Sequence, residues 1–184
     1  MTNKIRLSRA WRDELGELLG KKTVGSRITD NTTEGTVDYA DNCQIADDYK
    51  ITNVQLNHDK DLTASIYPHL HWFQASANVP NWLLQYRWQI NGGAKVTSWT
   101  NYKCNTVAFT YTSGTIHQIC YGAAIAVPVG TTLSDIIQFR ICRDTDNDST
   151  VFAGADPLTG NASALMFDVH FVLDSNGSIN EYSK

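Results

Sequence analysis

The amino-acid sequence predicts an all-β protein: an antiparallel β-sandwich of the jelly-roll type, preceded by a short N-terminal helix and an extended arm. Two observations predict the sandwich. Apolar and polar residues alternate with a period of two along successive segments after residue 43, and turn residues separate these segments. No helical pattern interrupts the alternation, which favours antiparallel strands over strand–helix–strand units. We expect about eight strands, the number in a jelly roll.

The N-terminal segment is the one place where the spacing predicts a helix. Between Ser8 and Gly20, the apolar residues Trp11, Leu15 and Leu18 recur at helical intervals. Ser8 is a suitable N-cap, and Gly20 is typical of the residue that ends a helix.

The segment from Thr23 to Asp41 is polar and has few large apolar residues, so we interpret it as an extended arm. The chain then divides into three parts. Residues 1–42 form the helix and docking arm, residues 43–174 form the sandwich, and residues 175–184 form a polar tail.

The strands of the sandwich follow from strict alternation between apolar and polar residues. The clearest segments cover residues 82–90, 107–111, 119–125, 137–141 and 165–173. The turns between them are Asn91-Gly92-Gly93, Ser113-Gly114 and Pro128-Val129-Gly130.

Composition and charge exclude several classes of protein. The chain has 184 residues, of which 42% are hydrophobic and 18% charged, which fits one globular domain and excludes a disordered chain. The apolar runs are too short to span a membrane, and the opening residues lack the apolar core of a signal peptide. The pI of about 5.6 argues against a general nucleic-acid binder. We therefore expect neither a membrane nor a nucleic-acid partner.

Basic residues concentrate near the N-terminus, although the net charge of the whole chain is −4. Such asymmetry is typical of a segment that docks onto a partner, and it also occurs on an ordinary solvated surface. The candidate docking residues are Arg6, Arg9, Trp11, Arg12, Leu15, Leu18, Lys21 and Lys22.

Two histidines, His69 and His71, are separated by one residue and so share one face of a strand. Such a pair can present two imidazoles to one metal ion, and His170 is the plausible distant ligand beside Asp168. A cupin-type metal site would carry a glutamate where this chain has Gln74. We therefore predict no metal, no cofactor and no catalytic residue. A cupin-like metal-dependent enzyme using these three histidines is an alternative hypothesis.

Aromatic residues suggest a further alternative, a carbohydrate-binding module for host adsorption. Their alternation along strands favours a place in the core over a sugar-stacking surface. The aromatics concerned are Trp72, Trp82, Trp88, Trp99, Tyr86 and Tyr102.

The run Asp144–Asp148 resembles the start of a calcium-binding loop. An EF-hand would need Gly where Ser149 stands and Glu where Ala155 stands, so the EF-hand interpretation fails. A polar turn between strands is favoured, and a structural cation there is left open.

Several segments, taken in order, resemble a family of uncharacterised tailed-bacteriophage proteins found among virion structural genes. The most specific is the Pro68-His69-Leu70-His71-Trp72 element, and the resemblance covers most of the chain from about residue 50 onward. The matching segments are residues 11–15, 55–58, 67–72, 82–88, 140–144, 148–158 and 167–171.

The resemblance implies a β-sandwich component of a virion rather than an enzyme, and it supplies no catalytic residues. We expect a capsid decoration or head-fibre-type protein, or a head–tail accessory protein, made in the host cytoplasm and located in the virion. Its partners would be capsid, neck or tail subunits. We also expect a homo-oligomer, with a trimer favoured.

Overall fold

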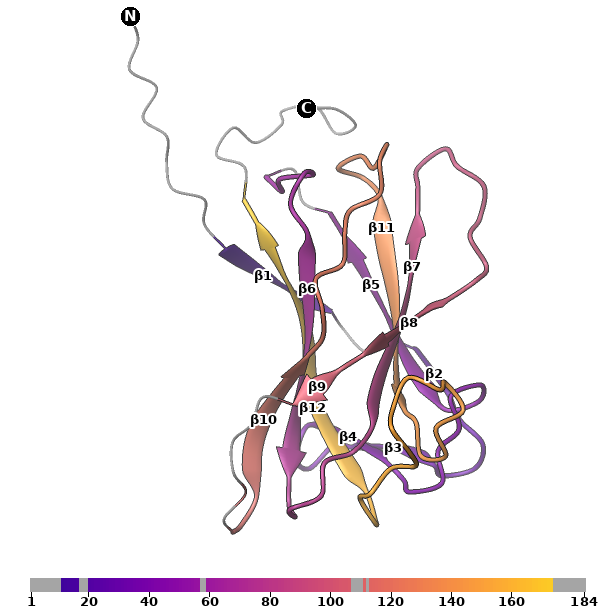
Figure 1. Ribbon diagram of the computed structural model, residues 1–184, viewed down its shortest axis with the longest axis vertical. Coiled ribbons are helices and arrows are strands. Elements are labelled where there is room, and N and C mark those ends of the chain that lie inside the picture. The colour runs from indigo at the N-terminus through magenta and orange to yellow at the C-terminus, as the bar shows by residue number, and fades with distance from the viewer. Residues whose placement is uncertain (1–10, 17–19, 57–58, 107–110, 112, 174–184) are drawn as a thin grey trace, which may run out of the picture.

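The computed structural model describes residues 11–16, 20–56, 59–106, 111 and 113–173. These residues form two antiparallel β-sheets and contain no helix (Figure 1). None of the described segments could therefore cross a membrane as a helix. The predicted all-β class is confirmed, and the arrangement in two sheets is compatible with a β-sandwich. The predicted C-terminal tail and most of the strand predicted over residues 107–111 lie outside the described residues.

The two sheets differ in size. The larger sheet has the order β3 (Ile28–Asn31), β4 (Thr36–Tyr39), β12 (Ala162–Val172), β6 (Ile66–Gln74), β10 (Ile116–Tyr121) and β9 (Asn105–Thr106), and β1 (Trp11–Gly16) also pairs with β12. The smaller sheet has the order β2 (Gly20–Lys22), β5 (Tyr49–Gln55), β11 (Ile136–Arg143), β7 (Trp82–Gln89) and β8 (Thr100–Lys103).

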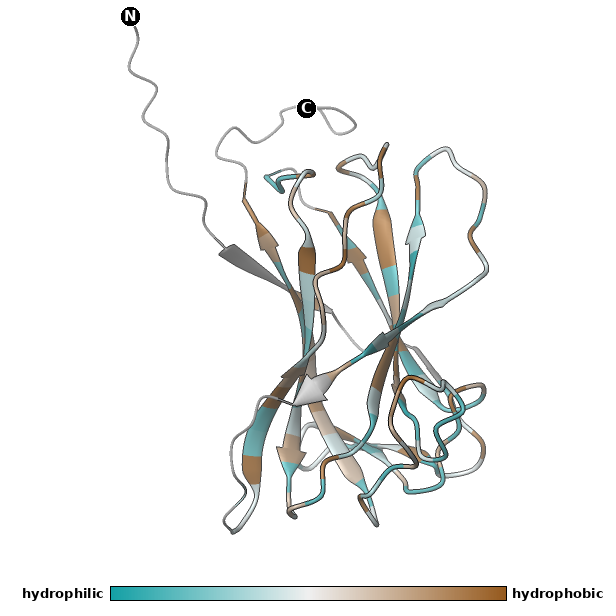
Figure 2. Ribbon diagram, in the orientation of Figure 1, coloured by the Kyte–Doolittle hydropathy of each residue, from teal (hydrophilic) through white to brown (hydrophobic). Residues whose placement is uncertain are grey.

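The hydrophobic core lies between the sheets because each strand directs alternate side chains toward the other sheet. Leu70 and Trp72 from β6 and Phe139 and Ile141 from β11 are fully buried members of one core cluster. Hydrophobic and hydrophilic positions alternate visibly along β10 and β11 (Figure 2). Each fully buried large apolar side chain stabilises the fold by roughly 1.5–3 kcal/mol.

The last strand, β12, contains a bulge that changes which residues face the core. The register with β6 shifts between Ala164 and Met166. Ala164 is buried before the shift and Phe167 after it, whereas Leu165 is only partly buried. The extra residue therefore turns Asp168 to the outer face, away from the smaller sheet. The regular alternation predicted Leu165 on the same face of the strand as Phe167, and the bulge makes that prediction wrong.

The helix predicted from Ser8 to Gly20 is wrong wherever the structure describes that segment, because Trp11–Gly16 is strand β1 and Gly20–Lys22 is strand β2. β1 pairs with β12 over six residues, with Trp11 opposite Val172. An isolated helix of this length is marginal in water, whereas an open edge of β12 supplies a complete ladder of backbone hydrogen bonds.

The extended arm predicted from Thr23 to Asp41 is also wrong. The segment contains the hairpin β3–β4, and β4 pairs with the start of β12. Its few apolar residues are spaced so that Ile28, Val37 and Tyr39 reach the core. Burying these three side chains supplies the free energy that an exposed arm would lack.

A buried carboxylate, Asp48, holds the chain that precedes this hairpin. It accepts hydrogen bonds from the backbone N–H groups of Val24 and Gln44, each at 2.9 Å, and its Oδ2 lies 3.0 Å from Nη1 of Arg27. Burial alone would raise the pKa of Asp48, but these N–H groups and the guanidinium hold that pKa below its ordinary value. Asp48 therefore stays charged and ties β3 to the start of β5.

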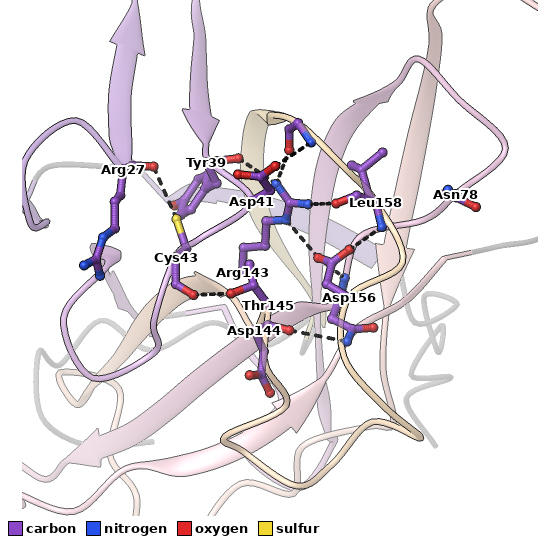
Figure 3. Close-up of polar contacts among 12 residues, drawn as sticks. Arg27, Tyr39, Asp41, Cys43, Asn78, Arg143, Asp144, Thr145, Asp156 and Leu158 are labelled. Carbon is purple, nitrogen blue, oxygen red and sulfur yellow. Dashed lines mark hydrogen bonds and ion pairs between the residues drawn. The ribbon is translucent and has the colours of Figure 1, made fainter.

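Arg143, at the end of β11, joins the two sheets through a fully buried guanidinium (Figure 3). Its Nε donates to Oδ2 of Asp156 at 2.8 Å, and its Nη1 donates to the carbonyl of Tyr39 at 2.9 Å. Nη1 and Nη2 also donate to the carbonyls of Gly160 and Leu158. One side chain thus holds the end of β4 and the loop that leads into β12.

We predict that Arg143→Met lowers the free energy of unfolding by about 3–5 kcal/mol, because it leaves the Asp156 carboxylate buried without its cation. Chemical denaturation monitored by fluorescence measures this change. Lys95→Met is the matched control, since Lys95 is an exposed cation. Equal stabilities for the two variants would contradict the role given to Arg143.

Candidate functional site

Four of the five histidines of the chain gather on the outer face of the larger sheet. His69 and His71 come from β6, His117 from β10 and His170 from β12. They share this face because they alternate with core residues on neighbouring strands: Leu70 and Trp72 on β6, Cys120 on β10, and Val169 on β12. We call these four residues and Asp168 the histidine cluster.

Asp168 lies at the centre of the histidine cluster, and it is almost fully buried, with 4% of its surface exposed. Its Oδ1 lies 3.3 Å from Nδ1 of His69, and its Oδ2 lies 3.2 Å from Nε2 of His71. Burial alone would raise the pKa of Asp168, but the contact with His69 and the nearby rings of His71 and His170 hold that pKa below its ordinary value. Asp168 is therefore an anion at neutral pH.

His71 connects Asp168 to His117. Nδ1 of His71 lies 2.9 Å from Nε2 of His117, and the two rings are stacked with an interplanar angle of 13°. One set of tautomers satisfies every contact: His117 donates from Nε2 to His71, and His71 donates from Nε2 to Asp168. Burial and the neighbouring His71 lower the pKa of His117, which favours the neutral form of the His117 imidazole.

His69 and His170 lie on the other side of Asp168. Their ring centroids are 3.9 Å apart, and one donor atom from each of these three residues lies within 4.8 Å of the other two. Nδ1 of His69 and Oδ1 of Asp168 are buried, and neither makes an aligned hydrogen bond in spite of their 3.3 Å separation. Two imidazoles and a carboxylate thus converge, and one nitrogen of His69 and one oxygen of Asp168 have no hydrogen-bond partner.

The three histidines selected from the sequence are therefore divided by the structure. His69 and His170 converge with Asp168, and His69 lies against its Oδ1, whereas His71 contacts its Oδ2. His117 was not among the residues selected from the sequence, because it is 46 residues from His71 and meets it only through the pairing of β6 with β10. The alternation of His117 with buried Gln118 and Cys120 was the available signal, but it does not identify the neighbouring strand.

The candidate docking residues do not form a helical stripe. Trp11, Arg12 and Leu15 lie in β1 and Lys21 and Lys22 in β2, and the side chain of Leu15 is exposed. Nζ of Lys22 lies 2.6 Å from Oδ1 of Asp47, so this cation already has an ion-pair partner within the chain. The remaining docking candidates lie outside the described residues: Arg6, Arg9 and Leu18.

Most of the aromatic residues considered for sugar binding lie in the core, as the alternation predicted. Trp72, Trp82, Trp88 and Tyr102 are buried, and Tyr86 packs against the core cluster. Trp99 is partly exposed, and its ring centroid lies 4.2 Å from the guanidinium carbons of both Arg87 and Arg140. Within the described residues, these tryptophans do not line an exposed sugar-binding row.

The run Asp144–Asp148 forms a turn in which Asp144 is buried and Asp146 and Asp148 are exposed. Asp144 accepts hydrogen bonds from the backbone N–H and the hydroxyl of Ser149. Among the described residues, the group with three convergent metal-binding side chains is the one formed by His69, Asp168 and His170. The polar-turn interpretation of this run fits these contacts.

Comparison with known proteins adds no family assignment: no protein-family model matches the chain, and no curated protein matches it significantly.

We predict that Asp168→Asn lowers the free energy of unfolding by about 1–3 kcal/mol at pH 7, because a buried anion that the histidines stabilise is replaced by a neutral amide. Denaturation in the presence of a chelator measures the effect without bound metal. Asp146→Asn, an exposed aspartate in a turn, is the matched control. A variant at Asp168 as stable as this control would contradict the electrostatic account of the cluster.

Proposed function

We propose that the protein is a non-enzymatic structural component of a bacteriophage virion, built as a jelly roll and assembled by protein–protein contacts. The observation that carries this proposal is the nested pairing of its strands. β4 pairs with β12, β5 with β11, β6 with β10, and β7 with β8. In the sequence, each of these pairs encloses the pair named after it.

This nesting supports the jelly-roll assignment, because it produces four neighbouring strands in each of the two sheets: β4-β12-β6-β10 in the larger and β5-β11-β7-β8 in the smaller. Jelly rolls serve as viral capsid domains, lectin domains and cupins. These three classes correspond to the three functions considered from the sequence, so the choice among them depends on where the chemistry-bearing side chains lie.

Two observations favour the virion component. A cupin-like enzyme would use metal-binding histidines inside the barrel, whereas His69, His71 and His170 lie on the outer face, opposite the core residues of β6 and β12. A carbohydrate-binding module would expose its tryptophans, whereas Trp72 and Trp82 are fully buried. The resemblance of the Pro68–Trp72 element to phage structural proteins points in the same direction.

Exposed apolar side chains offer surfaces for assembly. Leu15 on β1 is 64% exposed, and Val129 in the loop before β11 is completely exposed. Tyr121 and Ile136 are exposed as well. We propose that such positions join copies of the chain in a homo-oligomer, with a trimer favoured, and that the basic N-terminal segment docks onto a capsid, neck or tail subunit.

Incorporation into particles tests this proposal. We expect the full-length protein in purified phage particles, and about tenfold less of a variant lacking residues 1–10, equivalent to about 1.4 kcal/mol of docking free energy. This deletion removes Arg6 and Arg9 and leaves every described strand intact. Quantitative mass spectrometry of the particles measures both amounts.

The control is a variant lacking residues 175–184, which is shortened equally and should be incorporated as well as the full-length protein. Circular dichroism establishes that both variants are folded. Absence of the full-length protein from particles would overturn the virion function. Normal incorporation of the variant lacking residues 1–10 would overturn the docking role alone.

A further inference from the structure

We propose that His69, Asp168 and His170 bind a divalent transition-metal ion, with Zn²⁺ as the best-suited ion, on the outer face of the larger sheet. The site is independent of the proposed virion function, because it rests only on the geometry of side chains within one chain. It also differs from the cupin-like hypothesis, since Asp168 replaces His71 as a ligand and the site lies outside the sandwich.

The donor set fits this chemistry. Two imidazoles and one carboxylate form the ligand set of several zinc sites and of non-haem iron sites, in which three protein ligands leave positions open for water or another donor. Ligand bonds of about 2.0–2.2 Å allow two donors to lie at most about 4.4 Å apart. The donor atoms here lie within 4.8 Å of one another, so that small side-chain rotations bring them into range.

A second, independent observation points to a ligand at this position. Nδ1 of His69 and Oδ1 of Asp168 are both buried, and neither has an aligned hydrogen-bond partner. Buried polar atoms are almost always satisfied, since an unsatisfied one costs about 1–3 kcal/mol. A cation between His69 and Asp168 would satisfy both atoms at once.

His71 and His117 are positioning residues for this site. His71 contacts Oδ2 of Asp168 at 3.2 Å, which leaves Oδ1 directed toward His69. His117 in turn orients the ring of His71 through the 2.9 Å contact between their nitrogens. Outer hydrogen bonds of this kind fix the orientation of metal ligands and raise their affinity for the ion.

The ion would link β6 to β12, which are neighbours in the middle of the larger sheet. All four cysteines are free, so within the described residues no disulfide serves this purpose. Metal binding to the folded state alone would therefore stabilise the sandwich by mass action.

Zinc titration of the full-length protein, stripped with a chelator and measured by calorimetry, tests the proposal. We expect one ion per chain, together with a rise in Tm on adding Zn²⁺. His170→Gln and Asp168→Asn should each weaken binding by more than about 100-fold, beyond the 10–100-fold typical of an outer partner. His117→Gln is the matched control and should weaken binding by less than about tenfold, because His117 reaches Asp168 only through His71 and so lies one contact farther from the ion than an outer partner.

X-ray absorption at the zinc edge of the wild-type protein provides a test that needs no variant. It should show imidazole nitrogens and a carboxylate oxygen at about 2.0–2.2 Å. Absence of saturable Zn²⁺ binding would overturn the proposal. So would a loss of affinity in His117→Gln as large as that in His170→Gln, because the ion would then lie between His71 and His117.

Discussion

The antiparallel pairing of β6 with β12 is the constraint on which both the core and the outer face depend. Once Leu70 lies opposite Phe167, these side chains pack toward the smaller sheet. The adjacent pair, His69 and Asp168, must then face outward, since successive side chains of a strand alternate. A slip of one residue would bury Asp168 in the core, at a cost of several kcal/mol for an unpaired charge.

The bulge of β12 makes this register compatible with the rest of the strand. The short side chain of Ala164 faces the core near the hairpin of β3 and β4, whereas the large side chain of Phe167 faces it farther along. A regular strand could not direct both inward, because they are three residues apart. Bulges commonly redirect side chains beside functional sites, and here the bulge supplies Asp168 and His170 to the histidine cluster.

Arg143 acts at the opposite end of the same strand. Its guanidinium binds the carbonyls of Tyr39 and Gly160, so that β4 and the loop entering β12 are held to the end of β11. A buried charge is stable only when its hydrogen bonds are satisfied, and Asp156 with three carbonyls achieves this. These contacts fix the position of the chain at Gly160, just ahead in the sequence of Ser163, where β12 begins to pair with β6.

The sequence predicted the elements whose alternation is strict, and failed where pairing partners decide the outcome. The strands predicted over residues 82–90 and 137–141 correspond to β7 and β11, and most of the apolar residues of these two strands are buried. The spacing of Trp11 and Leu15 suits a helix, but this segment forms a strand because it pairs with the free edge of β12. The local sequence does not show that this edge is available for pairing. His117 likewise joins the histidine cluster only through the register of β10.

The most direct test of the central claim is an NMR measurement of the register between β6 and β12 in the isotopically labelled protein. Cross-strand nuclear Overhauser effects between backbone protons should connect Asp168 with His69 and Phe167 with Leu70. Contacts that instead connect Phe167 with His69 and Asp168 with Pro68 would mean that β12 has no bulge. The histidine cluster and the proposed metal site would then both be wrong.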